Sequence, residues 1–179
     1  MPCLVETFAA HGARVAFIDK DKESGRKLAE RLGDKTTFIS GDIAEESTIF
    51  NFARHVIRHC GSIHCLINNA CLSRRGILSD CGFEDFSYVL RVGVAAPYML
   101  AKLFLDNFAP GASIINIAST CAFMSQADTE SYCLAPASFS CPAKDETWPG
   151  MNSPLGDRSK GAGEARQAAE CLSHGFKLL

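Results

Sequence analysis

The sequence lacks any apolar run near the ~20 residues that a transmembrane helix needs, so it does not predict a membrane span. Its first residues have no basic stretch ahead of a long apolar one, and we therefore expect no signal peptide. The sequence also lacks a large excess of charge of either sign. It has 18 Lys and Arg residues and 20 Asp and Glu residues, which give a net charge of −2. This balance gives no reason to expect nucleic acid or an anionic membrane as a partner.

Paired cysteine spacing is absent as well. The chain has nine cysteines, an odd number, and none forms a C-x-x-C pair. A secreted disulfide scaffold is shorter and evenly paired, so we predict a cytoplasmic protein with reduced thiols. His55 and His59 lie four residues apart, a spacing that can bind zinc, but no second ligand pair accompanies them. A polar helix face is the favoured interpretation, and we predict no metal site.

Short apolar segments alternate with helix-like segments over the first two thirds of the chain. The predicted strands cover residues 14–19, 36–40, 64–70 and 112–119, and the predicted helices cover residues 20–33, 44–61 and 83–111, with a kink near Gly93 and Pro97. The strands are continuous apolar runs, which is typical of strands buried on both faces. Alternation of strands with helices indicates βαβ units, so the sequence predicts an α/β fold with a parallel sheet.

The composition changes after Ala135. Four prolines fall within residues 136–163, at positions 136, 142, 149 and 154, and apolar periodicity is weak there. Such a stretch is typical of loop or disorder, although residues 163–179 can form a short helix. We therefore divide the chain into a partial domain, residues 1–135, and a divergent, loop-rich or disordered tail, residues 136–179.

Polar residues stand at the ends of the first three predicted strands. Asp19 ends one of them, where an acid in a dinucleotide-binding fold accepts hydrogen bonds from the adenosine ribose; a turn or a helix cap is the alternative. Asp42 can accept a hydrogen bond from an adenine amino group, or it can cap the helix that starts near Glu45. Asn68 and Asn69 either shape a ligand crevice or form a simple turn.

The fourth predicted strand ends at Ser119, and Tyr132 follows 13 residues later. Ligands bind at the carboxyl ends of parallel strands, which makes Ser119 a candidate site residue. A tyrosine hydroxyl has an ordinary pKa of ~10, so it needs help to act as an acid or base near neutral pH. A nearby ammonium group is the usual help, because it favours the phenolate.

Taken together, the segments "ETFAAHGARVAFIDKD", "GDI", "INNA", "SIINIAST" and "TESY" resemble the classical short-chain dehydrogenase/reductase family over about residues 5–135. The resemblance implies a Rossmann-like doubly wound sheet and hydride transfer between a nicotinamide and a small carbonyl or alcohol. It implies NAD rather than NADP, because the carboxylate of Asp19 would repel a 2′-phosphate. By the same resemblance, Asp19 holds the adenosine ribose, Asp42 and Ile43 contact adenine, Asn69 and Ala70 lie near the cofactor ribose, Ser119 holds the substrate, and Tyr132 is the catalytic acid/base.

Four departures from the family pattern stand out. The family's first strand and its T-G-x-x-x-G-I-G loop are not in the sequence, and residues 4–15 resemble the helix that follows that loop. Pro136 occupies the position of the lysine that lowers the tyrosine pKa in the family. Gly93 stands where the family has a relay asparagine, and Cys71 replaces the last glycine of N-N-A-G. We therefore expect weak or lost cofactor binding and impaired activity, in a truncated or frameshifted family member.

The missing strand would lie between residues 14–19 and 64–70 in the family's sheet. Hence we expect that the sheet closes up, that another segment fills the gap, or that the chain folds poorly. Two functions stay open: an NAD-linked oxidoreductase with impaired activity, and an inactive fragment that acts only as a binding or dimerisation module or is a non-functional product. By resemblance, the 83–108 helix is the candidate contact surface of a homo-oligomer.

Overall fold

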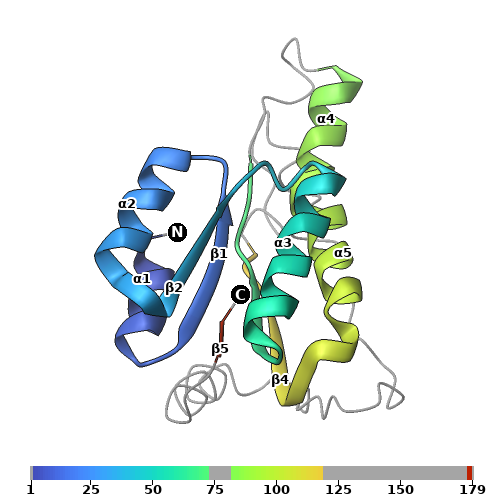
Figure 1. The fold of residues 1–179 in the computed structure, drawn as a ribbon. Coiled ribbons are helices and arrows are strands. Elements are labelled where there is room, and N and C mark those ends of the chain that lie inside the picture. The colour runs from blue at the N-terminus through green and yellow to red at the C-terminus, as the bar shows by residue number, and fades with distance from the viewer. Residues whose placement is uncertain (1, 73–81, 119–176, 179) are drawn as a thin grey trace, which may run out of the picture.

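The computed structural model describes residues 2–72, 82–118 and 177–178. They form a five-stranded sheet in the order β2-β1-β5-β3-β4, and every strand pair in it is parallel. The strands are β1 (Arg14–Asp19), β2 (Thr36–Ser40), β3 (Ile63–Asn68), β4 (Phe108–Asn116) and β5 (Lys177–Leu178). Helices α1 (Pro2–Ala10) and α2 (Lys22–Leu32) cover one face, and α3 (Glu46–Cys60) and α5 (Ala96–Leu103) cover the other (Figure 1). The predicted α/β class with a doubly wound parallel sheet is confirmed.

The first βαβ unit follows the sequence pattern closely. β1 and β2 have the predicted bounds and pair in register from Val15 with Thr36 to Asp19 with Ser40. α2 begins after Asp21, whose side chain accepts a hydrogen bond from the backbone N–H of Ser24 at 3.0 Å. It ends at Gly33, whose φ of 69° lies in the left-handed region that glycine adopts without strain. Gly33 therefore caps the carboxyl end of α2.

Two apolar layers enclose the sheet, one on each face. Toward α1 and α2 the core contains Val5, Ala9, Ala13, Val15, Phe17, Leu28 and Cys65. Toward α3 and α5 it contains Ala16, Ile49, Phe52, Ala53, Val56, Ile63, Leu66, Ala96, Leu100 and Phe104. Neighbouring residues of β1 alternate between the layers, as successive side chains of a strand must. The buried residues of α3 lie in the second layer, with Ile57 packed against it.

The predicted helix of residues 83–111 is wrong in its last residues. The structure has α4 (Phe83–Leu90), a π-helical turn η2 (Arg91–Ala95), α5, and a 3₁₀ turn η3 (Leu105–Asn107) before β4 begins at Phe108. β4 therefore starts before the predicted residue 112. Pro110 has no N–H to donate, and Gly111 has a φ of 78°, so neither residue continues a helix. The predicted kink near Gly93 coincides with η2.

β5 lies between β1 and β3 (Figure 1). Arg14 pairs with Lys177, and Leu178 pairs with both Val15 and Cys65. The expectation that another segment of the chain fills the place of the missing strand is thus observed, over two residues. Residues 136–176, which make up most of the predicted tail, lie outside the part of the chain that the structure describes. Within that part, no helix has the length and apolar character needed to cross a membrane.

Candidate functional site

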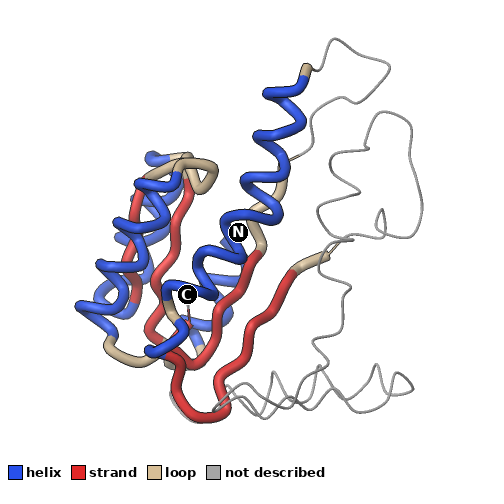
Figure 2. Tube along the Cα trace, turned by 90° about the vertical axis from the view of Figure 1, so that its right-hand side faces the viewer, coloured by secondary structure: helices blue, strands red, loops and turns tan. Residues whose placement is uncertain are grey.

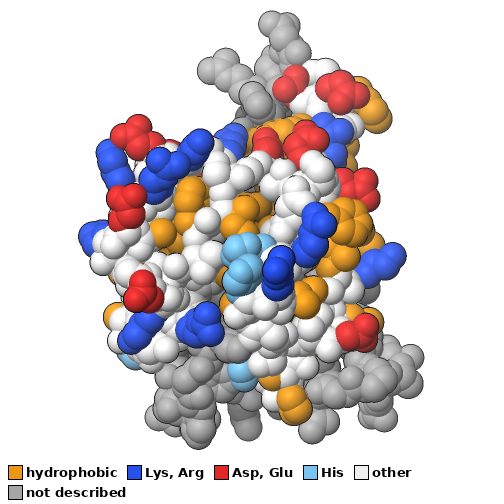
Figure 3. Space-filling view, viewed as in Figure 1, with side chains coloured by type: hydrophobic (Ala, Val, Ile, Leu, Met, Phe, Trp, Pro, Cys, Tyr) orange, Lys and Arg blue, Asp and Glu red, His pale blue; other side chains and the backbone are white. Residues whose placement is uncertain are grey.

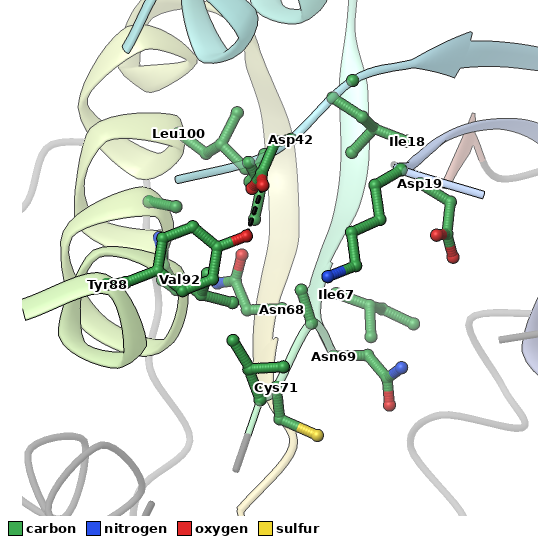
Figure 4. Close-up of a pocket in the computed structure, with 17 residues that line it drawn as sticks. Ile18, Asp19, Asp42, Ile67, Asn68, Asn69, Cys71, Tyr88, Val92 and Leu100 are labelled. Atoms are coloured by element: carbon green, nitrogen blue, oxygen red, sulfur yellow. Dashed lines mark hydrogen bonds between the residues drawn. The ribbon is translucent and has the colours of Figure 1, made fainter. Parts of the chain in front are cut away.

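A cavity of about 270 Å³ opens at the carboxyl ends of β1 and β3 (Figure 4). The carboxyl ends of parallel strands meet at one edge of a sheet, where α/β folds bind ligands. All five residues predicted to bind the cofactor line this cavity: Asp19, Asp42, Ile43, Asn69 and Ala70. The structure thus brings the five together from three separate strand ends, while their roles stay predictions.

Asp19 lies at the end of β1, across the cavity from Tyr88 in the close-up (Figure 4). Its Oδ1 accepts a hydrogen bond from the backbone N–H of Asp21 at 3.0 Å, which is the turn that the sequence offered as an alternative. Asp21, in turn, caps α2, and its hydrogen bonds with Ser24 hold the pKa of its carboxyl below the ordinary value. Only one carboxylate oxygen of Asp19 is used in this turn, so the other can accept from a ligand.

Asp42 is held by two donors from different elements. Its Oδ1 accepts from the backbone N–H of Ala44 at 2.9 Å, and its Oδ2 accepts from the hydroxyl of Tyr88. α3 begins at Glu46 with Glu45 in the cap position, so Asp42 fixes the turn before the helix and does not cap it. Each carboxylate oxygen can accept a further hydrogen bond. Asp42 can therefore fix this turn and still accept a hydrogen bond from an adenine amino group.

Tyr88 is a site residue that sequence reasoning missed. It lies on α4, and its ring is also 5.9 Å from the guanidinium carbon of Arg91, a cation–π distance. The wall of the cavity continues from Tyr88 through Val92 of η2 to Ala96, Pro97 and Leu100 of α5. No local pattern marks Tyr88, because its contact with Asp42 arises only from the position of α4 beside the turn that follows β2.

The two asparagines after β3 are used differently. Asn68 donates from Nδ2 to Oδ1 of Asn116 at 2.8 Å, and its backbone C=O accepts from Ile117 at 2.9 Å. These bonds tie the ends of β3 and β4 together, and Asn68 also lines the cavity. Asn69, Ala70 and Cys71 follow it in the cavity lining.

Ser119, Tyr132 and Pro136 lie outside the described residues. β4 ends at Asn116, three residues before Ser119 in the sequence and at the same edge of the sheet as the cavity.

The two histidines of α3 stack on each other, with ring centroids 4.1 Å apart. Burial, followed by the positive charges of His59 and Arg58, holds the pKa of His55 below its ordinary value. Among the described residues, no group of three His, Cys, Asp or Glu side chains is placed to hold a metal ion. The four cysteines in this part of the chain, Cys3, Cys60, Cys65 and Cys71, carry thiols rather than disulfides.

Comparison with known proteins decides the family. The model of the short chain dehydrogenase family matches residues 3–138. The chain belongs to the short-chain dehydrogenase family. The match includes the positions of Ser119 and Tyr132, which the structure does not describe.

Individual members of the short-chain dehydrogenase family support this assignment. An uncharacterised oxidoreductase of Thermotoga maritima is 31% identical over 134 residues, which are 72% of this chain and 52% of that protein. The L-fucose dehydrogenase of Mus musculus is 30% identical over 131 residues, which are 72% of this chain and 48% of that enzyme. The chain thus spans about half the length of the curated relatives that it matches.

Solved structures give the same fold. An apo SCOR enzyme from Clostridium thermocellum superposes with a TM-score of 0.71 at 37% identity, over 77% of this chain and 56% of that one. A blue fluorescent protein from a metagenomic library, solved in complex with NADPH, gives a TM-score of 0.70 at 25% identity, over 75% of this chain and 57% of that one. The Rossmann-like α/β fold of the short-chain dehydrogenases is therefore the fold of this chain.

Proposed function

We propose that this chain binds a nicotinamide dinucleotide, with the adenosine half of the cofactor in the cavity at the ends of β1 and β3. The observation that carries the proposal is that Asp19, Asp42, Ile43, Asn69 and Ala70 line one cavity. The free carboxylate oxygen of Asp19 accepts from the ribose hydroxyls. Ile43 packs on the adenine ring, and the carboxylate of Asp42 accepts from its amino group.

The charges of the lining fit this cofactor. Lys20 also lines the cavity, and among the described lining residues it is the single basic one, so it is placed to attract the pyrophosphate. Asp19 disfavours a 2′-phosphate by repulsion, and we therefore propose NAD rather than NADP. The walls formed by Ile18, Ile67 and Leu100 are apolar and keep water from the adenosine half.

We further propose that the chain descends from an oxidoreductase acting on a small carbonyl or alcohol, with impaired turnover. When bound, the nicotinamide would accept or donate the hydride. Ser119 would hold the substrate oxygen, and Tyr132 would exchange its proton. Pro136 supplies no ammonium group to favour the phenolate, so Tyr132 would be a poor acid/base near neutral pH.

Calorimetric titration with NADH tests cofactor binding apart from turnover. We expect saturable binding that Asp19→Asn weakens about tenfold or more, because a hydrogen bond to a charged acceptor contributes about 1.5–3 kcal/mol. Asp34→Asn is the matched control, since Asp34 is an exposed acid of η1 that does not line the cavity. Absence of NADH binding at millimolar concentration, or equal weakening by both variants, would contradict the proposal.

Turnover is tested separately, with the same protein and a panel of small alcohols and carbonyls. Any rate that Tyr132→Phe abolishes supports a residual oxidoreductase. If the native chain and Tyr132→Phe both bind NADH and neither shows turnover, the result supports the inactive fragment that acts only as a binding module.

The second candidate function, a dimerisation module, is favoured by exposed apolar side chains between residues 83 and 108. Phe83 is 80% exposed, Tyr98 is 63% exposed and Leu105 is 49% exposed. Hydrophobic side chains also appear among basic ones over α3 and α5 (Figure 3). Sedimentation velocity should give a dimer that Tyr98→Glu dissociates and Lys102→Ala leaves intact. A monomeric native chain would contradict this function.

A further inference from the structure

The carboxylate of Asp42 is held from two directions at the wall of the proposed cofactor site. Its Oδ1 accepts a hydrogen bond from the backbone N–H of Ala44 at 2.9 Å, and its Oδ2 accepts one from the hydroxyl of Tyr88 (Figure 4). The backbone C=O of Asp42 also accepts from the N–H of Glu45 at 3.0 Å, which closes the turn after β2. The main chain and the side chain of Asp42 are therefore both held in place.

Tyr88 belongs to a row of side chains along one helical rod. α4, η2 and α5 form this rod, and its α4 end lies beyond the carboxyl ends of β3 and β4 (Figure 2). Tyr88, Val92, Ala96 and Leu100 line the cavity at intervals of four residues. In a regular α-helix each such interval turns the side chain about 40° away from the previous one. The wider π-helical turn η2 offsets part of this rotation, so the rod keeps Tyr88 on the face that lines the cavity.

A carboxylate held in this way distinguishes purine bases by the position of their hydrogen-bond donors. An ionised carboxylate only accepts hydrogen bonds. Adenine carries an amino group at position 6, which donates, whereas a 6-oxo purine carries a carbonyl oxygen there, which accepts. In hypoxanthine the donor is the N–H at position 1 instead. A carboxylate placed for the 6-amino group therefore meets an oxygen in hypoxanthine, and two acceptors face each other with no hydrogen between them.

We propose that Tyr88 determines the base specificity of this site, by locking the carboxylate of Asp42 so that a 6-amino purine is selected over a 6-oxo purine. The inference rests on the proposed function, in which the adenosine half of the cofactor lies in this cavity. Tyr88 is a positioning residue, because its hydroxyl acts on the base only through Asp42. Without that hydroxyl, the carboxylate keeps the single bond from Ala44 and can pivot toward the donor of either base. Selectivity thus comes from rejection of the wrong base as well as from the contact with the right one.

Calorimetric titration of the full chain with NADH and with deamino-NADH, in which hypoxanthine replaces adenine, tests the selectivity. We expect the native chain to bind NADH about tenfold or more tightly than deamino-NADH, because the second ligand leaves a charged acceptor unpaired. Tyr88→Phe should lower this ratio to about threefold or less. A merely structural role of Tyr88 would weaken both ligands by the same factor and leave the ratio unchanged. Tyr98→Phe is the matched control, since this exposed tyrosine of α5 does not line the cavity.

A double-mutant cycle shows whether Tyr88 acts through Asp42. Asp42→Asn keeps an oxygen for the N–H of Ala44 and can turn an amide N–H toward a 6-oxo group, so we expect the ratio of the two affinities to fall to about one. In this background Tyr88→Phe should leave the ratio unchanged, because no carboxylate remains to be locked. The two substitutions are therefore expected to be non-additive in the ratio, as for residues in direct contact.

The outcomes separate this inference from the proposed function on which it rests. If the native chain binds NADH but prefers it to deamino-NADH by a smaller factor than expected, the inference is wrong and cofactor binding stands. That comparison needs no variant, so it decides the matter even if Tyr88→Phe does not fold. A native ratio in Tyr88→Phe, or a changed ratio in Tyr98→Phe, also overturns the inference. Failure to bind either dinucleotide overturns both the inference and the proposed function.

Discussion

The hydroxyl of Tyr88 donates a hydrogen bond to Oδ2 of Asp42, and this contact joins α4 to the turn after β2. The two residues lie 46 positions apart, and both line the cavity at the carboxyl ends of β1 and β3. The same carboxylate also accepts from the N–H of Ala44 at 2.9 Å. Tyr88 therefore positions the acid that we propose to contact adenine.

Tyr88→Phe removes this hydrogen bond and keeps the ring. We expect the free energy of unfolding to fall by about 1–2 kcal/mol, because the bond is partly buried and its acceptor is charged. Urea denaturation measures the change. Tyr98→Phe is the matched control, since Tyr98 is 63% exposed and lies on the next helix. Equal stability of Tyr88→Phe and the native chain would show that the contact contributes nothing.

Replacement of Asp19 by serine changes the preference between the two nicotinamide cofactors. Serine keeps a hydrogen-bonding group at the end of β1 and removes the negative charge that repels a 2′-phosphate. We expect the ratio of NADPH to NADH affinity to rise roughly tenfold or more. Parallel titrations with NADH and NADPH measure this ratio, and an unchanged ratio would place the ribose away from Asp19.

Gly25 is required where α2 crosses β2. A Cβ atom built at Gly25 would lie 2.3 Å from Cε2 of Phe38, so the ring must move. We expect Gly25→Ala to lower the free energy of unfolding by about 1–3 kcal/mol, although alanine favours helix more than glycine does. Phe38→Leu in the same chain should recover part of the loss. Glu30→Ala on the exposed face of α2 is the control, expected to stay within about 0.5 kcal/mol of the native chain.

His55 makes the stability of the fold depend on pH. Burial, with the nearby charges of His59 and Arg58, lowers its pKa below the ordinary 6.5, so the folded chain takes up this proton less readily than the unfolded chain. The contribution of neutral His55 to the free energy of unfolding is complete above about pH 6.5. It is lost as the pH falls through the lowered pKa of His55 in the folded chain. His55→Gln should flatten the change of unfolding free energy in this window. An NMR titration of His55 giving a pKa above 6.5 would contradict the assignment.

Local signals predicted much of the fold. The bounds of β1 and β2 and the glycine cap of α2 follow from apolar runs and turn residues within a few positions. The start of β4 was misplaced, because the helical pattern runs on through apolar residues before Pro110 and Gly111 end it. Tyr88 and β5 have no local signal at all, since each is placed by contacts with residues far away in the sequence.

The place of β5 has a consequence for the order of folding. β1 with β2 and β3 with β4 are strand pairs whose partners are neighbours in the sequence, each joined through its own connecting helices. Within the described part of the chain, the backbone ladders of the two pairs are joined only through Lys177 and Leu178, so Arg14 pairs with a residue more than 160 positions away. Closing so long a loop carries a large entropic penalty that is not recovered until late. We therefore expect the β1–β2 and β3–β4 pairs to form early. The pairing of β5 with β1 and β3 should form last on folding and break first on unfolding.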